Sequence, residues 1–236
     1  MRRLETTPSR GEQVYTALRD SIRDCTLAPG TPIVQEDIAQ ALGVSRQPVQ
    51  QALALLKSDG LVLERGGRGL YVAPIDPAQM AYHYQIRMVL DQLAARLAAE
   101  RARQDPAFGS ELRARSDAVL ALGDAALKAG DAAKAVRHDA EFHALLYEMS
   151  GNPLIGSTAE SHWNFLLRVM VGVLTQAMRG PVVWGQHHEI IDAVLAGDPE
   201  TAAQLAADHV IGAEQALLAA DREGNLIDTA NQRGAA

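Results

Sequence analysis

Residues 27–62 read LAPGTPIVQEDIAQALGVSRQPVQQALALLKSDGLV, and this stretch decides the fold of the N-terminal part of the chain. Two short helices are predicted here, separated by a tight turn at Gly43, and Ser45 is a favourable N-cap for the second helix. Pro48 lies in the first turn of that second helix, where a missing N–H breaks no helical hydrogen bond. We expect the first helix to turn three apolar side chains inward: Ile38, Ala41 and Leu42.

Elements on both sides complete this pattern. Before it, apolar residues recur every four positions and predict one more helix: Val14, Leu18 and Ile22. After it, GGRGLYVAP at residues 66–74 places a glycine-rich tip between two β-like runs, 61–63 and 70–72, which predicts a hairpin. Three helices followed by a glycine-tipped hairpin predict a winged helix-turn-helix.

The second helix of such a motif enters the major groove of DNA with its N-terminal residues toward the bases. Arginine can pair with guanine and glutamine with adenine, a serine at the helix N-terminus suits a phosphate, and an arginine at the wing tip can reach the minor groove or the backbone. The candidate DNA-binding residues are Ser45, Arg46, Gln47, Gln50 and Arg68. A capped amphipathic helix with a solvated polar face is the alternative, but the helix before it and the Gly-Arg-Gly tip after it favour DNA binding.

The 236 residues are 47% hydrophobic, a composition that excludes a disordered chain, a collagen-like repeat and a disulfide scaffold. No apolar run approaches the roughly 18–20 residues that cross a bilayer, and the N-terminal segment lacks the apolar core of a signal peptide. The single cysteine, Cys25, cannot form an internal disulfide. We therefore expect a cytoplasmic protein.

The net charge of −7 is divided unevenly along the chain. Residues 1–75 hold nine Lys and Arg against eight Asp and Glu, whereas residues 76–236 hold 13 against 21, together with all seven histidines. The total charge would argue against nucleic acid as a partner, but the predicted winged helix is close to neutral. We therefore expect weak non-specific binding to DNA and an operator choice that depends on few contacts.

Ala-Pro-Ile-Asp-Pro at residues 73–77 disfavours helix and predicts a linker between an N-terminal domain, 1–75, and a C-terminal domain, 76–236. The C-terminal domain is rich in Ala, Leu, Glu and Arg and is interrupted by turn signals. The fold class is therefore mainly α, with an all-α antiparallel bundle of about six helices after the winged helix. The expected helices lie near 78–104, 110–129, 131–149, 153–179, 182–196 and 199–220.

Four residues of the helical domain have spacings that suit a metal site. Asp139 and His143 are four residues apart and project from the same face of one helix. His187 and His209 stand eleven residues before and after Asp198. In an antiparallel helix pair, a rise of about 1.5 Å per residue puts both about 16 Å from the turn, at the same height. One carboxylate and three imidazoles are a credible donor set for a borderline divalent metal ion.

A single histidine on a helix is more often a surface or core residue than a ligand, and Asp139 with His143 could be an ordinary surface pair. We prefer that interpretation for the other histidines of the chain: His83, His138, His162 and His188. The last two could still lie near the site.

The N-terminal domain resembles the DNA-binding domain of GntR-family bacterial repressors, through residues 27–62 and 66–74. In that family the recognition helix commonly reads Ser-Arg-Thr-Pro-Val-Arg-Glu-Ala-Leu. The resemblance implies that Arg46 reads a base. Gln47 and Gln50 stand where the family usually has Thr and Arg, so this chain departs from the pattern that reads the usual family operator.

DAEFHALLYEMSGNPL at residues 139–154 and HHEIIDAVLAGDPETAAQLAADHV at residues 187–210 resemble the metal-containing, FCD-like ligand-binding domain of the FadR-type branch of the GntR family. The whole resemblance covers roughly residues 12–220. It implies four metal ligands: Asp139, His143, His187 and His209. The count back from Gly197-Asp198 selects the first histidine of the His-His pair rather than the second. Zinc is the expected metal, with nickel and manganese as alternatives.

Residues 86–91 resemble the first helix of that ligand-binding domain, in which the family has an arginine facing the cavity. Arg87 would be costly to bury without an anion, so a small carboxylic acid that bridges Arg87 and the metal is the expected effector. Alternatively, Arg87 pairs with Asp91 at the surface. Asn164 and Arg168 are further candidates for effector binding.

The leading hypothesis is a homodimeric, ligand-responsive transcriptional regulator, a repressor, that binds an inverted repeat in double-stranded operator DNA and no membrane. The first alternative is a metal-sensing regulator. The second is a metal-dependent hydrolase joined to a DNA-binding module, in which the metal would activate water. No general base is evident beside the expected ligands, which argues against an enzyme.

Overall fold

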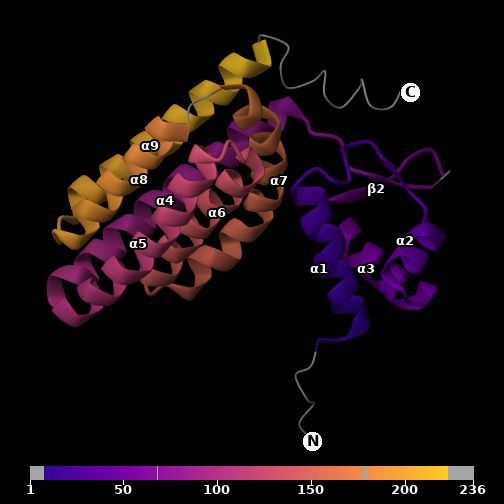
Figure 1. Cartoon of the computed structure of the whole chain (residues 1–236), viewed down its shortest axis with the longest axis horizontal. Coiled ribbons are helices and arrows are strands. Elements are labelled where there is room, and N and C mark those ends of the chain that lie inside the picture. Colours follow the sequence, from indigo (N-terminus) through magenta and orange to yellow (C-terminus); the bar gives the residue numbers. More distant parts are fainter. Residues whose placement is uncertain (1–7, 68, 178–179, 223–236) are drawn as a thin grey trace, which may run out of the picture. The chain divides into compact units, whose positions relative to one another are not determined.

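The computed structural model of the chain describes residues 8–67, 69–177 and 180–222. These residues form two compact units that divide between Ile75 and Asp76 (Figure 1). No helix in the described part of the chain is both long and apolar enough to cross a membrane.

The N-terminal unit contains three helices that follow the sequence pattern closely. Helix α1 (Arg10–Arg23) begins at the N-cap Ser9, whose hydroxyl accepts a hydrogen bond from the backbone of the first turn. Helix α2 (Gln35–Leu42) ends at Gly43, and the φ of 62° at this glycine is the left-handed conformation that commonly ends helices. Helix α3 (Arg46–Ser58) starts directly after this turn.

Helices α1 and α3 pack against each other through their apolar stripes. The buried side chains of this core come mainly from these two helices: Val14, Leu18, Ile22, Val49, Ala52, Leu53 and Leu56. In α2, Ala39 is buried and Ile38 half-buried, whereas Ala41 and Leu42 are exposed, so the predicted inward face of α2 was partly wrong. Four of the eight residues of α2 are apolar, and in so short a helix they are compatible with two different buried faces. The packing of α2 against α3 decides which of these faces is buried.

A small antiparallel sheet completes the N-terminal unit. Strands β2 (Val62–Glu64) and β3 (Leu70–Val72) form the expected hairpin, with Leu63 opposite Tyr71. Strand β1 (Pro32–Ile33) pairs with the other edge of β3, which gives the order β1-β3-β2. Strand β1 was not predicted from the sequence, because two residues are too few to show a periodic pattern.

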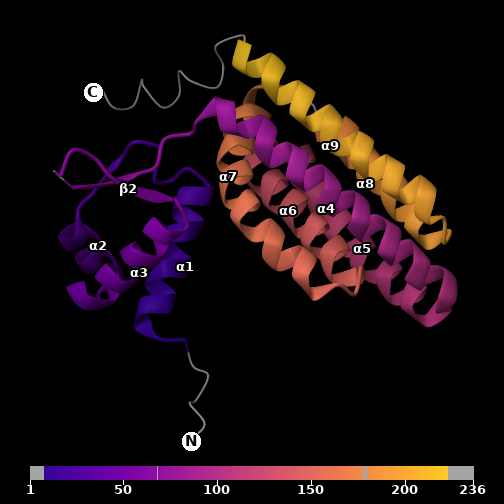
Figure 2. The ribbon, with the colours of Figure 1, turned by 180° about the vertical axis from the view of Figure 1, so that it is seen from behind.

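The C-terminal unit is the expected bundle of helices. Its helices are α4 (Pro77–Gln104), α5 (Pro106–Lys128), α6 (Ala132–Met149), α7 (Pro153–Ala177), α8 (Gly180–Leu195) and α9 (Pro199–Arg222). Helix α4 contacts every other helix of the unit, and α8 lies side by side with α9 (Figures 1 and 2). Side chains from α4, α6, α8 and α9 can therefore meet inside the bundle.

Two helices of the bundle begin earlier than the sequence indicated. Helix α5 begins at Pro106 rather than near residue 110, and the Asp105 side chain caps it by accepting from the Ala107 N–H at 2.9 Å. Helix α8 begins at Gly180 rather than at residue 182. A proline that interrupts one helix can also start the next, because the first turn of a helix needs no N–H from it.

Gly123 on α5 has no room for a side chain, because the Trp184 ring from α8 lies against it. A Cβ atom at residue 123 would lie 2.0 Å from Trp184 Cη2. Gly123→Ala should therefore lower the free energy of unfolding by about 1–3 kcal/mol, measured by chemical denaturation. The same tryptophan ring meets the His187 ring edge-on, with centroids 4.9 Å apart, so its displacement would also disturb His187.

Gly109→Ala is the matched control, because Gly109 lies on the same helix and an added Cβ there would have no neighbour within 4 Å. Alanine at this position should raise the free energy of unfolding by about 0.5–1 kcal/mol, since glycine loses more backbone entropy on folding. Equal stability changes in the two variants would contradict the packing explanation.

Candidate metal centre and candidate nucleic-acid interface

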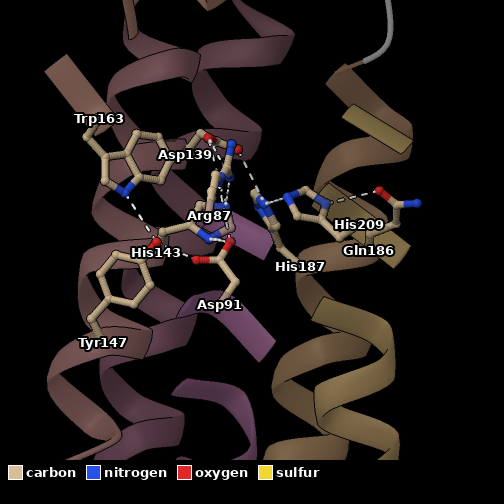
Figure 3. Close-up of polar contacts among 9 residues, drawn as sticks. All are labelled: Arg87, Asp91, Asp139, His143, Tyr147, Trp163, Gln186, His187 and His209. Carbon is tan, nitrogen blue, oxygen red and sulfur yellow. Dashed lines mark hydrogen bonds and ion pairs between the residues drawn. The ribbon is translucent and has the colours of Figure 1, made fainter. Parts of the chain in front are cut away.

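The four residues with metal-ligand spacing lie together inside the helical bundle. Asp139 and His143 come from α6, His187 from α8 and His209 from α9 (Figure 3). All four side chains are buried, with exposed fractions between 0 and 3%. One potential ligand atom from each residue lies within 4.8 Å of the others, so the structure brings together the set that the spacing predicted.

The local structure explains how residues far apart in the chain come together. Asp139 and His143 lie one helical turn apart on the buried face of α6. A tight turn at Gly197 joins α8 to α9, and the Asp198 side chain caps α9 by accepting from the Thr201 N–H at 3.1 Å. The two histidines on either side of this turn lie level, with 3.3 Å between their Nε2 atoms.

The distances between donor atoms fit one shared ion. Atom Nε2 of His187 lies 3.3 Å from Asp139 Oδ1, and Nε2 of His143 lies 4.0 Å from Asp139 Oδ2. Donors with bonds of about 2.0–2.2 Å to a single ion lie about 3–4 Å apart. Oδ2 of Asp139 is buried and makes no hydrogen bond, which is costly in the absence of a cation. The residues present therefore fit a divalent metal ion.

The electrostatics of the cluster also suit metal binding. Burial lowers the pKa of His187 and His209 well below the usual value, and the neighbouring histidines lower it further. Burial raises the pKa of Asp139, which makes its charged form costly unless a cation lies beside it. His209 Nδ1 donates to Gln186 Oε1 at 3.1 Å, which leaves the lone pair of Nε2 facing the cluster. Neutral imidazoles with inward lone pairs are the form that a metal ion binds.

Arg87 and Asp91 of α4 lie beside these four residues, each with an exposed fraction of 1%. Arg87 Nε donates to Asp91 Oδ2 at 3.3 Å, and Nη2 donates to His143 Nε2 at 2.6 Å. The guanidinium also lies over the Trp163 ring, 4.3 Å from its centroid. Arg87 and Asp91 thus form the pair that one interpretation expected, but the pair is buried beside the four candidate metal ligands and not at the surface.

Opposite charges stabilise this buried pair. Burial opposes the charge of Arg87, but Asp91 and Asp139 raise the pKa of its guanidinium above the usual value. Burial alone would raise the pKa of Asp91, but His143 and Arg87 lower it to about 2. Both groups are therefore charged near neutral pH.

The remaining predicted residues of the helical unit lie outside the four-residue cluster. Asn164 and Arg168 are both buried on α7, where Asn164 follows the Trp163 that contacts Arg87. The other histidines have different neighbours. The Nδ1 atoms of His83 and His162 are hydrogen-bonded to each other at 3.0 Å, and His138 is hydrogen-bonded to Glu141 at 2.7 Å. His188 is exposed and lies 3.8 Å from Asp124.

Three site residues were not identified from the sequence: Tyr147, Trp163 and Gln186. Tyr147 Oη donates to Asp91 Oδ1 and in turn accepts from Trp163 Nε1 at 3.2 Å. The only signal for Tyr147 was its position one turn after His143 on the same helix, which by itself also fits an ordinary core residue.

In the N-terminal unit, the candidate DNA-binding residues lie at the start of α3. Ser45, Arg46, Gln47 and Gln50 are exposed, and the hydroxyl of the N-cap Ser45 makes no capping hydrogen bond. Arg46 Nη2 lies 2.5 Å from Glu36 Oε2 on α2, and both side chains are nearly two-thirds exposed. Arg68, the fifth candidate, lies outside the described residues.

Comparison with known proteins links both units to one family. Residues 10–72 match the bacterial regulatory proteins of the gntR family, and residues 83–212 match the FCD domain. An HTH-type transcriptional regulator from an unstable DNA locus of Streptomyces ambofaciens is 32% identical over 190 residues, which cover 78% of this chain and 75% of that protein.

Two further matches support the relation. The HTH-type transcriptional repressor RspR of Escherichia coli K12 is 38% identical over 96 residues, 41% of this chain and 42% of RspR, so that match spans less than half of the relative. A solved structure of a GntR transcriptional regulator from Rhodococcus sp. RHA1 is 32% identical, with a TM-score of 0.76 over 90% of this chain and 99% of that one. The chain therefore belongs to the GntR family of bacterial regulatory proteins, with an FCD domain as its helical unit, and is a transcriptional regulator rather than an enzyme.

Proposed function

We propose that the protein is a homodimeric, ligand-responsive repressor of the cytoplasm, in which residues 1–75 bind operator DNA and residues 76–236 bind a metal ion, an organic acid and the second protomer. One observation carries this proposal: a chain with an exposed recognition-helix N-terminus also has a buried cluster of three imidazoles and one carboxylate. The relative RspR is named a repressor, which supports the direction of regulation.

A homodimer is proposed because one winged helix reads only a few base pairs, whereas two copies related by a two-fold axis read an inverted repeat. Helix α4 supports this proposal, because apolar side chains spaced three and four residues apart are exposed along one of its faces. They are Tyr82, Ile86, Val89 and Leu93. In each protomer, Arg46, Gln47 and Gln50 would contact base edges, and Ser45 and Arg68 the backbone or the minor groove.

We propose zinc as the bound ion, with nickel and manganese as alternatives. Asp139, His143, His187 and His209 would hold it through one carboxylate oxygen and three imidazole nitrogens, a donor set typical of borderline divalent metals. When bound, the ion would supply a Lewis acid that attracts carboxylate oxygens. Binding at His143 would require Arg87 Nη2 to release its hydrogen bond to Nε2, because a lone pair cannot serve both partners.

The buried charges of the helical unit support an anionic effector. The buried side chains with a formal charge, among the described residues, are Arg87, Arg168, Asp91 and Asp139. These charges balance when the histidines are neutral, so a divalent cation adds an excess of two positive charges, which a small organic acid would offset. Arg87 Nη1 is buried without a hydrogen-bond partner and is the group that we expect to bind the acid, with Asn164 and Arg168 as further contacts.

Metal sensing is the second candidate function, favoured by a set of four protein donors that could bind the ion without any effector. In both functions, a ligand alters operator binding only if it has different affinities for two conformations of the protein. The two functions differ in one respect: removal of the metal alone would change operator affinity in a sensor, and not in a regulator that responds to an organic acid.

A thermal-shift screen of zinc-loaded protein against mono-, di- and tricarboxylates and sugar acids tests the proposed function. An acid present at 100 times its dissociation constant should stabilise the fold by about 2.7 kcal/mol, which corresponds to a rise in Tm of roughly 5–10 °C. Uncharged amides of the same acids are the control and should leave Tm unchanged. If no acid in the screen raises Tm, and if removal of zinc alone changes operator affinity, metal sensing would be favoured instead.

A further inference from the structure

Asp91 is a buried carboxylate beside the four candidate metal ligands, although it is not one of them. Its Oδ1 accepts a hydrogen bond from Tyr147 Oη. Its Oδ2 lies 3.3 Å from Arg87 Nε and 3.1 Å from His143 Nδ1 (Figure 3). One buried carboxylate thus accepts hydrogen bonds from Tyr147 and Arg87 and lies in ion-pair contact with His143.

The contact with His143 has a consequence for the protonation of that ring. A charged carboxylate can only accept, so a proton on Nδ1 of His143 is favoured by Asp91. A neutral imidazole with its proton on Nδ1 has its lone pair on Nε2, and Nε2 of His143 is the nitrogen that faces Asp139. A carboxylate behind a ligating imidazole fixes the tautomer and raises the basicity of the ligand.

The three histidines differ in this respect. His209 Nδ1 donates to the neutral amide oxygen of Gln186. The Nδ1 atoms of His143 and His187 are both buried without a hydrogen bond, but that of His143 lies 3.1 Å from the Asp91 carboxylate. Among the described residues of the cluster, His143 is thus the histidine with a carboxylate against its outer nitrogen. We therefore expect His143 to be the strongest nitrogen donor of the set.

We propose that Asp91 is a positioning residue that presents Nε2 of His143 to the metal ion and, through Arg87 Nε, keeps the guanidinium beside the ion. This inference rests on the proposed metal function. The hydrogen bonds from Trp163 to Tyr147 and from Tyr147 to Asp91 hold the carboxylate in place. When Nη2 leaves His143, Arg87 would stay bonded to Asp91 through Nε, and Nη1 and Nη2 would be available to an anionic effector.

Asp91→Asn tests the proposal with little change in shape. An amide has one acceptor oxygen in place of two, so it cannot accept from all three donors. In metal-free protein with ¹⁵N-labelled histidine, NMR should show the Nδ1–H tautomer of His143 in the wild type. In the variant it should show a mixture of the Nδ1–H and Nε2–H tautomers. Zinc affinity, measured by competition with a chromophoric chelator, should fall about 10- to 100-fold. Asp91→Glu should restore part of this affinity.

Asp124→Asn is the matched control, because Asp124 also lies near a histidine, the exposed His188, outside the cluster. It should leave zinc affinity and the His143 tautomer unchanged. Should Asp91→Asn fail to fold, Tyr147→Phe is the second variant. It removes the hydrogen bond to Asp91 Oδ1 and the one that Tyr147 Oη accepts from Trp163, leaves the contacts of Asp91 with Arg87 and His143 in place, and should also weaken zinc binding.

The outcomes separate this inference from the proposed function. A wild-type protein that binds no zinc would overturn the metal function. The NMR measurement would still show whether Asp91 fixes the Nδ1–H tautomer of His143. A protein in which zinc binds equally well to the wild type and to Asp91→Asn would retain the metal function and overturn the inference. An Nε2–H tautomer of His143 in the wild type would overturn it as well.

Discussion

Replacing His187 with alanine should remove zinc from the protein, whereas replacing the adjacent His188 should not. The two residues are neighbours in sequence and chemically identical. His187 is fully buried, and its Nε2 lies 3.3 Å from both Asp139 Oδ1 and His209 Nε2. His188 is half-exposed and lies near Asp124. A four-donor site that loses one protein ligand should no longer retain its ion through gel filtration.

Elemental analysis of the purified variants measures this difference. We expect about one zinc ion per chain in the wild type and in His188→Ala, and less than about a tenth of that in His187→Ala. Zinc should raise Tm in the first two proteins and not in the third, because only an ion that binds the folded state stabilises it. Full zinc occupancy in His187→Ala would rule out the site.

The meeting of the four candidate metal ligands could be predicted from the sequence, because it depends on regular helix geometry. Asp139 and His143 are one turn apart, a relation that holds in any helix. His187 and His209 are equally far from the turn at Gly197-Asp198, so their positions follow from the rise per residue once the two helices run antiparallel. The 3.3 Å between their Nε2 atoms agrees with that expectation.

The environment of Arg87 could not be predicted in the same way. Both Arg87 and Asp91 are compatible with a surface ion pair, since residues one turn apart can pair on any face of a helix. Their burial follows from the contacts of α4 with the helices around it, which no local pattern encodes. The contact of Tyr147 with Asp91 likewise joins residues 56 positions apart. Long-range packing therefore decides which charged groups surround the cluster.

Arg46→Ala should weaken binding to operator DNA about 5- to 150-fold, because a bidentate arginine–guanine contact is worth about 1–3 kcal/mol. Arg46 is exposed at the N-terminal end of α3, where a recognition helix meets base edges. It must first leave Glu36, but an exposed ion pair contributes only about 0–1 kcal/mol. The exchange of partners therefore favours the DNA contact.

Lys57→Ala is the matched control, because Lys57 is a basic residue at the other end of the same helix and also pairs with an exposed acid, Glu64 at 3.1 Å. DNA selected from a random library by the wild-type protein serves as the operator in gel-shift titrations. Loss of Arg46 should weaken binding and relax the preference at one base pair, whereas loss of Lys57 should affect all sequences equally and by less. Equal affinities of the wild type and Arg46→Ala would exclude Arg46 as a base-reading residue. Since residues 1–75 are nearly neutral, few phosphate contacts can compensate for the lost base contact.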